Sequence, residues 1–271
     1  MNVPPQVILQ PSSTLSTASC KTYTCLNATP TSIRLLISDG IQKGETVKLE
    51  IGGATNPRSI QPSEPFIIQT LDTDSTSLID TGFESRITMI NAGPITSFDI
   101  QQTNFTNGDT NTYTFSVQAV IPVVVGDKFT MTLPSEMGAP ADAATLACQP
   151  TQNLVKMKCS VTGQVIKIVF SEFTQPSGAF SWTISGIKNP GSTKPTEYFS
   201  DVHFLDTDEF IVSSLSEFTQ SHTVTNKEPA FLSVYSIEQG SLVSDAVTVY
   251  KINFTPVNPL PATGSIQMTY P

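Results

Sequence analysis

Apolar and polar residues alternate with a period of two through most of the chain. Tyr113, Phe115 and Val117 are separated by polar residues, and residues 129–133 follow the same rule. This period indicates β-strands that bury one face. No stretch shows sustained apolar spacing of three and four residues, and the 20 Pro are scattered through every segment, which argues against helices. The pattern therefore predicts an all-β protein.

One part of the pattern occurs twice without a gap. Ile95–Pro134 aligns with Leu232–Pro271, so that Tyr113 meets Tyr250 and the Met-Thr-x-Pro sequences at Met131 and Met268 coincide. Self-similarity at a fixed period is the signature of repeated structural units. We therefore expect the two segments to form the same strands.

A second pair of segments also repeats. The stretch from Gly44 to Asn56-Pro57 resembles the stretch from Gly178 to Asn189-Pro190. Each is followed by a Leu-Asp-Thr-Asp sequence, at Leu71–Asp74 and Leu205–Asp208, and each is preceded by a cysteine pair. The order of the pieces indicates one whole module and two partial ones.

The whole module spans residues 93–228 and contains about seven predicted strands, the size and strand number of an immunoglobulin-like sandwich. Within residues 1–92 the pattern of the module begins only at the cysteine pair, so the first strands of the module are missing. Residues 229–271, which we call the tail, contain only those first strands. The predicted fold is therefore a series of tandem immunoglobulin-like β-sandwich modules whose first member is incomplete.

An incomplete sandwich exposes an open sheet edge and an uncovered core. The tail supplies the matching piece, and we expect it to provide polymerisation strands through these residues: Tyr235, Ile237, Tyr250, Ile252, Phe254, Ile266, Met268 and Tyr270. Three arrangements are open. The tail folds back onto its own chain, it completes the first module of a neighbouring protomer by strand addition, or the sequence is one period of a longer covalent array. Repetition of one module-to-module operation favours a linear string over self-closure.

The four cysteines form one local pair per module, Cys20 with Cys25 and Cys148 with Cys159. We expect two disulfides, because the spacing does not suit zinc and no His lies nearby. Neither pair matches the long-range Cys…Trp…Cys pattern of antibody domains. Three sequons predict N-linked glycans and secretion to the extracellular space or cell surface: Asn27, Asn104 and Asn253.

Two acidic pairs end the predicted strands of the Leu-Asp-Thr-Asp sequences: Asp72 with Asp74, and Asp206 with Asp208. Carboxylates are hard oxygen ligands, so the pairs could bind calcium. The alternative is a polar turn in which Asp side chains accept hydrogen bonds from nearby backbone. A calcium site needs about six oxygens, and the sequence names two per module. We therefore expect no metal site and no cofactor.

Composition narrows the function further. The formal net charge of −9 argues against nucleic acid, because phosphate neutralisation needs a surplus of Lys and Arg. The longest apolar run, Ala119–Val125, contains Pro122 and is too short to insert into a membrane. Charged residues make up 14%, and 66 Ser and Thr take their place. With two His and no nucleophile motif, we expect a protein that is not an enzyme.

The repeated motifs resemble the tandem immunoglobulin-like repeats of large secreted surface proteins of protists, and protomers of glycosylated extracellular fibrils of aquatic microorganisms. The resemblance implies a structural role with covalently attached glycans and no chemistry. Together with the repeat pattern, it leads us to expect a filament subunit whose partner is another copy of itself. The alternative is a secreted adhesin that grips a glycan or protein through loops such as Gly138–Ala144 or Pro190–Pro195.

Overall fold

The computed structural model describes residues 8–9, 24–29, 32–49, 54–140, 146–174, 178–216 and 222–269. Of residues 8–9, 24–29, 54 and 234 it describes the backbone alone. These parts consist of strands, turns and loops without an α-helix, so the all-β prediction is confirmed. Within the same ranges, no helix is long and apolar enough to cross a membrane.

The chain divides into two compact units. Unit 1 contains residues 1–93 and 208–213, and unit 2 contains residues 94–207 and 214–271. The division into modules 1–92, 93–228 and 229–271 concerns repeat boundaries, and it stays a prediction.

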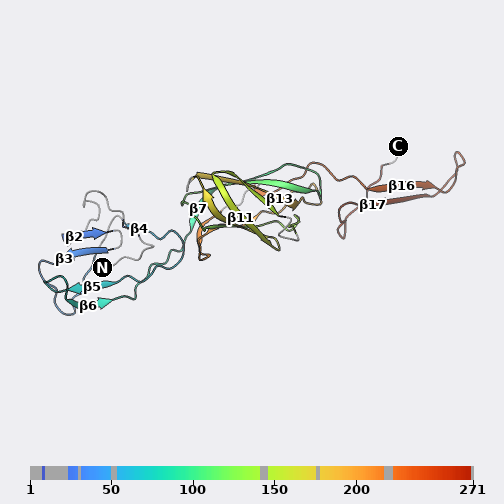
Figure 1. The fold of residues 1–271 in the computed structure, drawn as a ribbon. Coiled ribbons are helices and arrows are strands. Elements are labelled where there is room, and N and C mark those ends of the chain that lie inside the picture. Colours follow the sequence, from blue (N-terminus) through green and yellow to red (C-terminus); the bar gives the residue numbers. More distant parts are fainter. Residues whose placement is uncertain are drawn as a thin grey trace. The chain divides into compact units, whose positions relative to one another are not determined.

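Unit 2 contains a β-sandwich with two layers (Figure 1). The strands of one layer run in the order β10 (Ala147–Gln152), β13 (Gly178–Lys188), β8 (Thr110–Ala119) and β7 (Gly93–Gln102). The strands of the other run in the order β14 (Ser200–Leu205), β9 (Lys128–Thr132), β12 (Val165–Phe173) and β11 (Leu154–Thr162). The pairs within each layer are antiparallel.

Aromatic side chains fill the space between the layers. Phe129 of β9 lies edge-on to Trp182 of β13, with ring centroids 4.9 Å apart. Phe170 of β12 stacks on Phe180 of β13 at 6.1 Å. These four side chains are at most 1% exposed. Their alternation along each strand is the period that the sequence shows, and full burial of such side chains contributes about 1.5–3 kcal/mol each.

Unit 1 has short strands that form separate pairs (Figure 1). β1 (Ile8–Leu9) pairs with β4 (Ala54–Thr55), β2 (Thr24–Thr29) with β3 (Ser32–Leu36), and β5 (Ile68–Leu71) with β6 (Leu78–Gly82). β15 (Ile211–Ser214) lies in unit 1 up to Ser213. Among the described side chains before Pro94, only Ile33, Pro57 and Ser63 are buried. The side chains described before Pro94 therefore form no closed core among themselves.

The tail contains one hairpin, β16 (Val234–Gln239) and β17 (Tyr250–Thr255). Within the described part of the chain, these two strands pair only with each other. A lone two-stranded hairpin is marginally stable in water unless something covers one face.

Candidate self-association surfaces

The tail hairpin has an apolar face and a polar face. Cross-strand pairing places one mostly apolar set together, which we call the apolar hairpin face: Tyr235, Ile237, Gln239, Tyr250, Ile252 and Phe254. The opposite face is mostly polar: Val234, Ser236, Glu238, Lys251, Asn253 and Thr255. Tyr235 is 74% exposed and Ile237 is 61% exposed. The tail therefore presents a strip of large apolar side chains to solvent.

Strands β7 and β8 have a face that corresponds to the apolar hairpin face, and in the sandwich this face is buried. Their register is the β16–β17 register shifted by 137 positions, with these pairs: Phe98 with Val117, Ile100 with Phe115, and Gln102 with Tyr113. Phe98, Tyr113 and Phe115 are at most 2% exposed. Phe129 of the other layer lies 6.3 Å from Phe98, centroid to centroid. Two hairpins with the same register therefore differ in exposure: the apolar face is buried in β7–β8 and exposed in β16–β17.

The backbone turns repeat at the same spacing as the strands. Gly108, between β7 and β8, has φ 73°, and Asp245, 137 positions later, has φ 63°. Gly126, before β9, has φ 94°, and its counterpart Thr263 has φ 68°. A non-glycine residue with positive φ is uncommon. The tail therefore repeats the positive φ of these two turns even where the residue is not glycine.

The part of the tail after the hairpin corresponds to β9 but forms no strand. Residues 264–269 have no regular structure. Ile266 is 66% exposed and Met268 is 44% exposed, whereas their counterparts Phe129 and Met131 are fully buried. β9 pairs with β12 on one side and β14 on the other. Tyr270, the last predicted polymerisation residue, lies outside the described residues.

The hairpins of unit 1 match pieces of the sandwich. Next to its turn, β2–β3 has the register of β11–β12 shifted by 133 positions: Thr29 pairs with Ser32, as Thr162 pairs with Val165. Beyond an irregularity between Cys25 and Asn27, the two registers differ by one position. β5 ends at Leu71, as β14 ends at Leu205 in the same Leu-Asp-Thr-Asp sequence. In the sandwich, β9 joins β12 to β14, whereas β2–β3 and β5–β6 are separate two-stranded sheets. Unit 1 thus has hairpins that correspond to the strands flanking β9. Among its described residues, no strand joins these hairpins.

Residues 45–57 of unit 1 correspond to β13. Asn56 and Asn189 are 133 positions apart, and at this spacing Val47 and Leu49 fall on Phe180 and Trp182. β13 pairs with β8 along its length, whereas residues 45–49 form no strand. Val47 and Leu49 are 37% and 36% exposed, and Trp182 is fully buried. Their alternation is visible in the sequence, but we did not single them out as site residues.

Asn189 links four groups at the end of the sandwich. Its Oδ1 accepts hydrogen bonds from Asn111 Nδ2 at 2.9 Å and from the Tyr113 hydroxyl. Its Nδ2 donates to the Asn104 carbonyl at 3.0 Å and to the Thr106 carbonyl at 2.8 Å. Burial raises the pKa of Tyr113, so the hydroxyl keeps its proton and donates. The repeated Asn-Pro sequence pointed to Asn189, but its partners could not be read from spacing.

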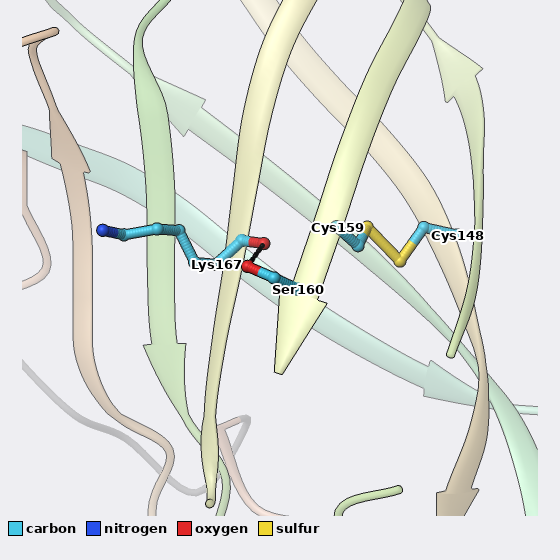
Figure 2. Close-up of a disulfide and its surroundings, with 4 residues drawn as sticks. All are labelled: Cys148, Cys159, Ser160 and Lys167. Carbon is cyan, nitrogen blue, oxygen red and sulfur yellow. Dashed lines mark hydrogen bonds between the residues drawn. A yellow bond between two sulfur atoms is a disulfide. The ribbon is translucent and has the colours of Figure 1, made fainter. Parts of the chain in front are cut away.

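A disulfide joins the outer strands of the two layers (Figure 2). Cys148 of β10 and Cys159 of β11 have Cα atoms 6.2 Å apart. The adjacent Ser160 hydroxyl donates to the Lys167 carbonyl of β12 at 3.5 Å. Cys20 lies outside the described residues, and the side chain of Cys25 is not described either. The second disulfide therefore stays a prediction.

The sequons lie in different surroundings. Asn253 is exposed on the polar face of the tail hairpin, where its Nδ2 donates to Ser236 Oγ at 3.4 Å. Asn104 is half-buried, and its Nδ2 donates to an Asp109 carboxylate oxygen at 2.9 Å. The side chain of Asn27, on β2, lies outside the described part. Glycosylation of Asn104 would have to replace the Asp109 contact, and Asn253 has no comparable restraint.

The acidic pairs sit in turns. Asp74 accepts hydrogen bonds from the Thr76 and Ser77 amides at 2.8 Å and from the Ser77 hydroxyl, which lower its pKa. Asp72 accepts from the Thr73 amide at 2.6 Å. Asp206 is buried, and Asp208 accepts from Gln61 Nε2 at 3.4 Å. Within the described ranges, no three His, Cys, Asp or Glu side chains are grouped to hold a metal ion.

Both histidines belong to the sandwich. His222 is 6% exposed, with its ring 5.7 Å from that of Phe98, and His203 lies on β14 beside β9. Burial lowers the pKa of both side chains, although Asp99 near His222 and Asp201 near His203 oppose the shift. Each imidazole is therefore neutral at neutral pH.

Comparisons with known proteins do not assign the chain to a family. No family model matches the sequence, and no curated protein matches it. Among solved structures, a non-cellulosomal cohesin from the hyperthermophilic archaeon Archaeoglobus fulgidus is similar to part of the chain, with 12% sequence identity and a TM-score of 0.29. The match covers 44% of this chain and 86% of the cohesin. The function therefore has to be argued from the surfaces described above.

Proposed function

We propose that this protein is the structural subunit of an extracellular filament, in which the tail of one copy completes the immunoglobulin-like module of unit 1 in the next. The observation that carries the proposal is the apolar hairpin face. It is exposed in the tail, while the hairpin of identical register, β7–β8, is buried in the sandwich. An exposed apolar strip of this kind marks an interaction site.

Unit 1 supports the proposal from the other side. Its two hairpins are unjoined where β9 joins their counterparts, and residues 45–49 form no strand where β13 pairs with β8. Strands that the described residues of unit 1 lack correspond in sequence to segments of the tail. Strand addition would satisfy backbone groups on both sides and place alternate side chains in register.

The free energy expected from burying the tail's apolar side chains is comparable to the free-energy cost of association. Each large apolar side chain contributes about 1.5–3 kcal/mol on full burial. The tail offers six such side chains, counting the hairpin and the stretch after it: Tyr235, Ile237, Ile252, Phe254, Ile266 and Met268. Their sum, roughly 9–18 kcal/mol, compares with an association cost of roughly 4–15 kcal/mol. The four hairpin side chains alone would contribute roughly 6–12 kcal/mol, which is close to the association cost, and the stretch after the hairpin adds to that margin.

Head-to-tail contacts use two different surfaces, so they do not close on themselves and they propagate into a filament. The same surfaces would join consecutive modules in a longer covalent chain. Asn253 lies on the polar face, so a glycan there would leave the apolar hairpin face free. The Cys148–Cys159 disulfide is compatible with an extracellular location.

The test is a charge placed on the apolar hairpin face. Ile237→Asp should prevent assembly, because a buried unpaired carboxylate is strongly unfavourable. Ser236→Asp is the matched control: Ser236 points to the polar face, and its counterpart in β7 is Asp99. Sedimentation and electron microscopy of residues 1–271 should show filaments for the unmodified chain and the control, and monomers for Ile237→Asp.

Deletion of residues 229–271 should prevent assembly as Ile237→Asp does. Ile237→Asp should also keep the thermal stability of the sandwich, since Ile237 lies on the tail hairpin and is exposed. Filaments that form without the tail would contradict the proposal. An unmodified chain that stays monomeric at high concentration would also contradict it, and would favour the adhesin hypothesis.

A further inference from the structure

We propose that residues 45–49 of unit 1 form an antiparallel pair with β17 of a second copy, in one fixed register. In this register Leu49 lies opposite Ile252, and Val47 lies opposite Phe254. The inference rests on the proposed function, because it specifies one junction of the proposed filament residue by residue.

The register follows from the pairing of β13 with β8. Trp182 lies opposite Phe115, and Phe180 lies opposite Val117. The unit 1 counterparts of β13 lie 133 positions earlier, and the tail counterparts of β8 lie 137 positions later. Both spacings are carried by backbone registers: the three pairs next to the β2–β3 turn repeat those next to the β11–β12 turn, and β16–β17 repeats the register of β7–β8. Shifting the β13–β8 pairs by these spacings gives Leu49 with Ile252.

Charge supports this register over its neighbours. Thr114 pairs with Thr183, and the same shifts place Lys251 opposite Glu50, a residue taken here from the sequence alone. Opposite charges facing each other across a strand pair contribute roughly 0.2–1 kcal/mol, and like charges are unfavourable. A slip of two residues in one direction sets Lys251 opposite Lys48, and a slip in the other sets it opposite Gly52.

A hydrogen bond at the end of the pair fixes the register further. In the sandwich, the Tyr113 hydroxyl donates to Asn189 Oδ1. The counterparts are Tyr250, which is 56% exposed, and Asn56, which is also exposed. At the junction the Tyr250 hydroxyl donates to Asn56 of the neighbouring copy. No corresponding hydrogen bond is expected for Tyr235, because its counterpart Phe98 carries no hydroxyl.

The experiment is disulfide trapping in assembled residues 1–271. The in-register variant carries Leu49→Cys with Ile252→Cys, and the out-of-register variant carries Leu49→Cys with Phe254→Cys. Directly opposite Cα atoms lie about 4.5–5.5 Å apart, within the range of a disulfide, whereas diagonal partners lie about 7–8 Å apart, beyond it. After mild oxidation, non-reducing electrophoresis should show a ladder of covalent multimers for the first variant alone.

Each outcome has a separate meaning. Filaments with a ladder only from the out-of-register pair, or from neither pair, would overturn the register and leave the proposed function standing. An intramolecular disulfide in a monomer would support the register and contradict head-to-tail assembly. A chain that gives neither filaments nor crosslinks would contradict both.

A second measurement tests the register without new cysteines. Tyr250→Phe should raise the critical concentration for assembly about three- to ten-fold, as expected for loss of one hydrogen bond. Tyr235→Phe is the matched control and should leave the critical concentration unchanged. Equal effects of the two substitutions would contradict the assignment of Asn56 as the partner of Tyr250.

Discussion

Single asparagine side chains organise the end of the sandwich. Asn189 is 2% exposed and uses both its oxygen and its nitrogen, and Asn226 Nδ2 donates to Asn107 Oδ1 at 3.1 Å and to the Pro190 carbonyl at 2.9 Å. A buried polar group is costly only when it lacks partners. The loops at this end therefore depend on a few amides for their shape.

Asn189→Ala should lower the free energy of unfolding by about 2–4 kcal/mol, because it leaves buried donors such as the Tyr113 hydroxyl without an acceptor. Trp182 is the single tryptophan and is fully buried, so its fluorescence reports the sandwich during denaturant unfolding. Asn56→Ala, in the Ile237→Asp background, is the matched control at an exposed position, and it should change stability by less than about 0.5 kcal/mol. Equal losses would refute a special role for Asn189.

The histidines predict a pH dependence. Burial lowers the pKa of His203 and His222 below the ordinary value of 6.5. Below pH 6.5 the unfolded chain therefore binds more protons than the folded one, and stability falls as the pH decreases toward the lowered pKa values. The thermal midpoint of the Ile237→Asp monomer should drop between pH 7.5 and pH 5.5, above the carboxylate range. Replacing both histidines with Gln should flatten that decrease, and an unchanged slope would contradict the assignment.

Strands at the outer edges of the sandwich are protected against pairing with other chains. β10 contains Pro150 beside a register shift, and β11 carries Lys156 and Lys158. Proline removes a donor and lysine disfavours edge-to-edge contact. The tail hairpin carries one lysine, Lys251, which faces away from the apolar side. The edge strands of the sandwich thus carry residues that disfavour pairing, whereas the apolar face of the tail hairpin carries no charge.

The disulfide couples two of these edge strands. Its loop spans 11 positions, and cross-linking a loop of this length removes unfolded-state entropy worth about 3 kcal/mol. Replacing Cys148 and Cys159 with Ser should lower the unfolding free energy of the sandwich by about 2–3 kcal/mol. Calorimetry of the Ile237→Asp monomer with and without the cysteines measures this. A change below about 0.5 kcal/mol would show that the layers hold their edge without the bond.

Sequence periodicity predicted the strands of unit 2 well, because each one buries a face within the same chain. The alternation at Tyr113, Phe115 and Val117 became β8, and that at Phe129 and Met131 became β9. The same alternation at Val47 and Leu49 gave no strand. A pattern reports which face a strand can bury, and the strand forms only where a partner is present.

The whole chain could be predicted only in outline. The repeats indicated three pieces, and the equal registers of β7–β8 and β16–β17 agree with the gapless alignment. The amide contacts of Asn189 were beyond reach, because they join residues 78–85 positions apart through loop conformations. The Asp72–Ser77 turn follows from short-range hydrogen bonds, and here local sequence was informative.

The exposed tail hairpin raises the question of how assembly before export would be avoided in a cell that makes this chain. In the proposed assembly, donor and acceptor are synthesised together on every molecule, so two copies would join as soon as their concentration allows. If the subunit is exported as proposed, joining before export would leave a polymer too large to pass a secretion channel. The proposal therefore implies that dilution inside the cell, a temporary cover over the hairpin, or rapid export keeps the subunits apart before export.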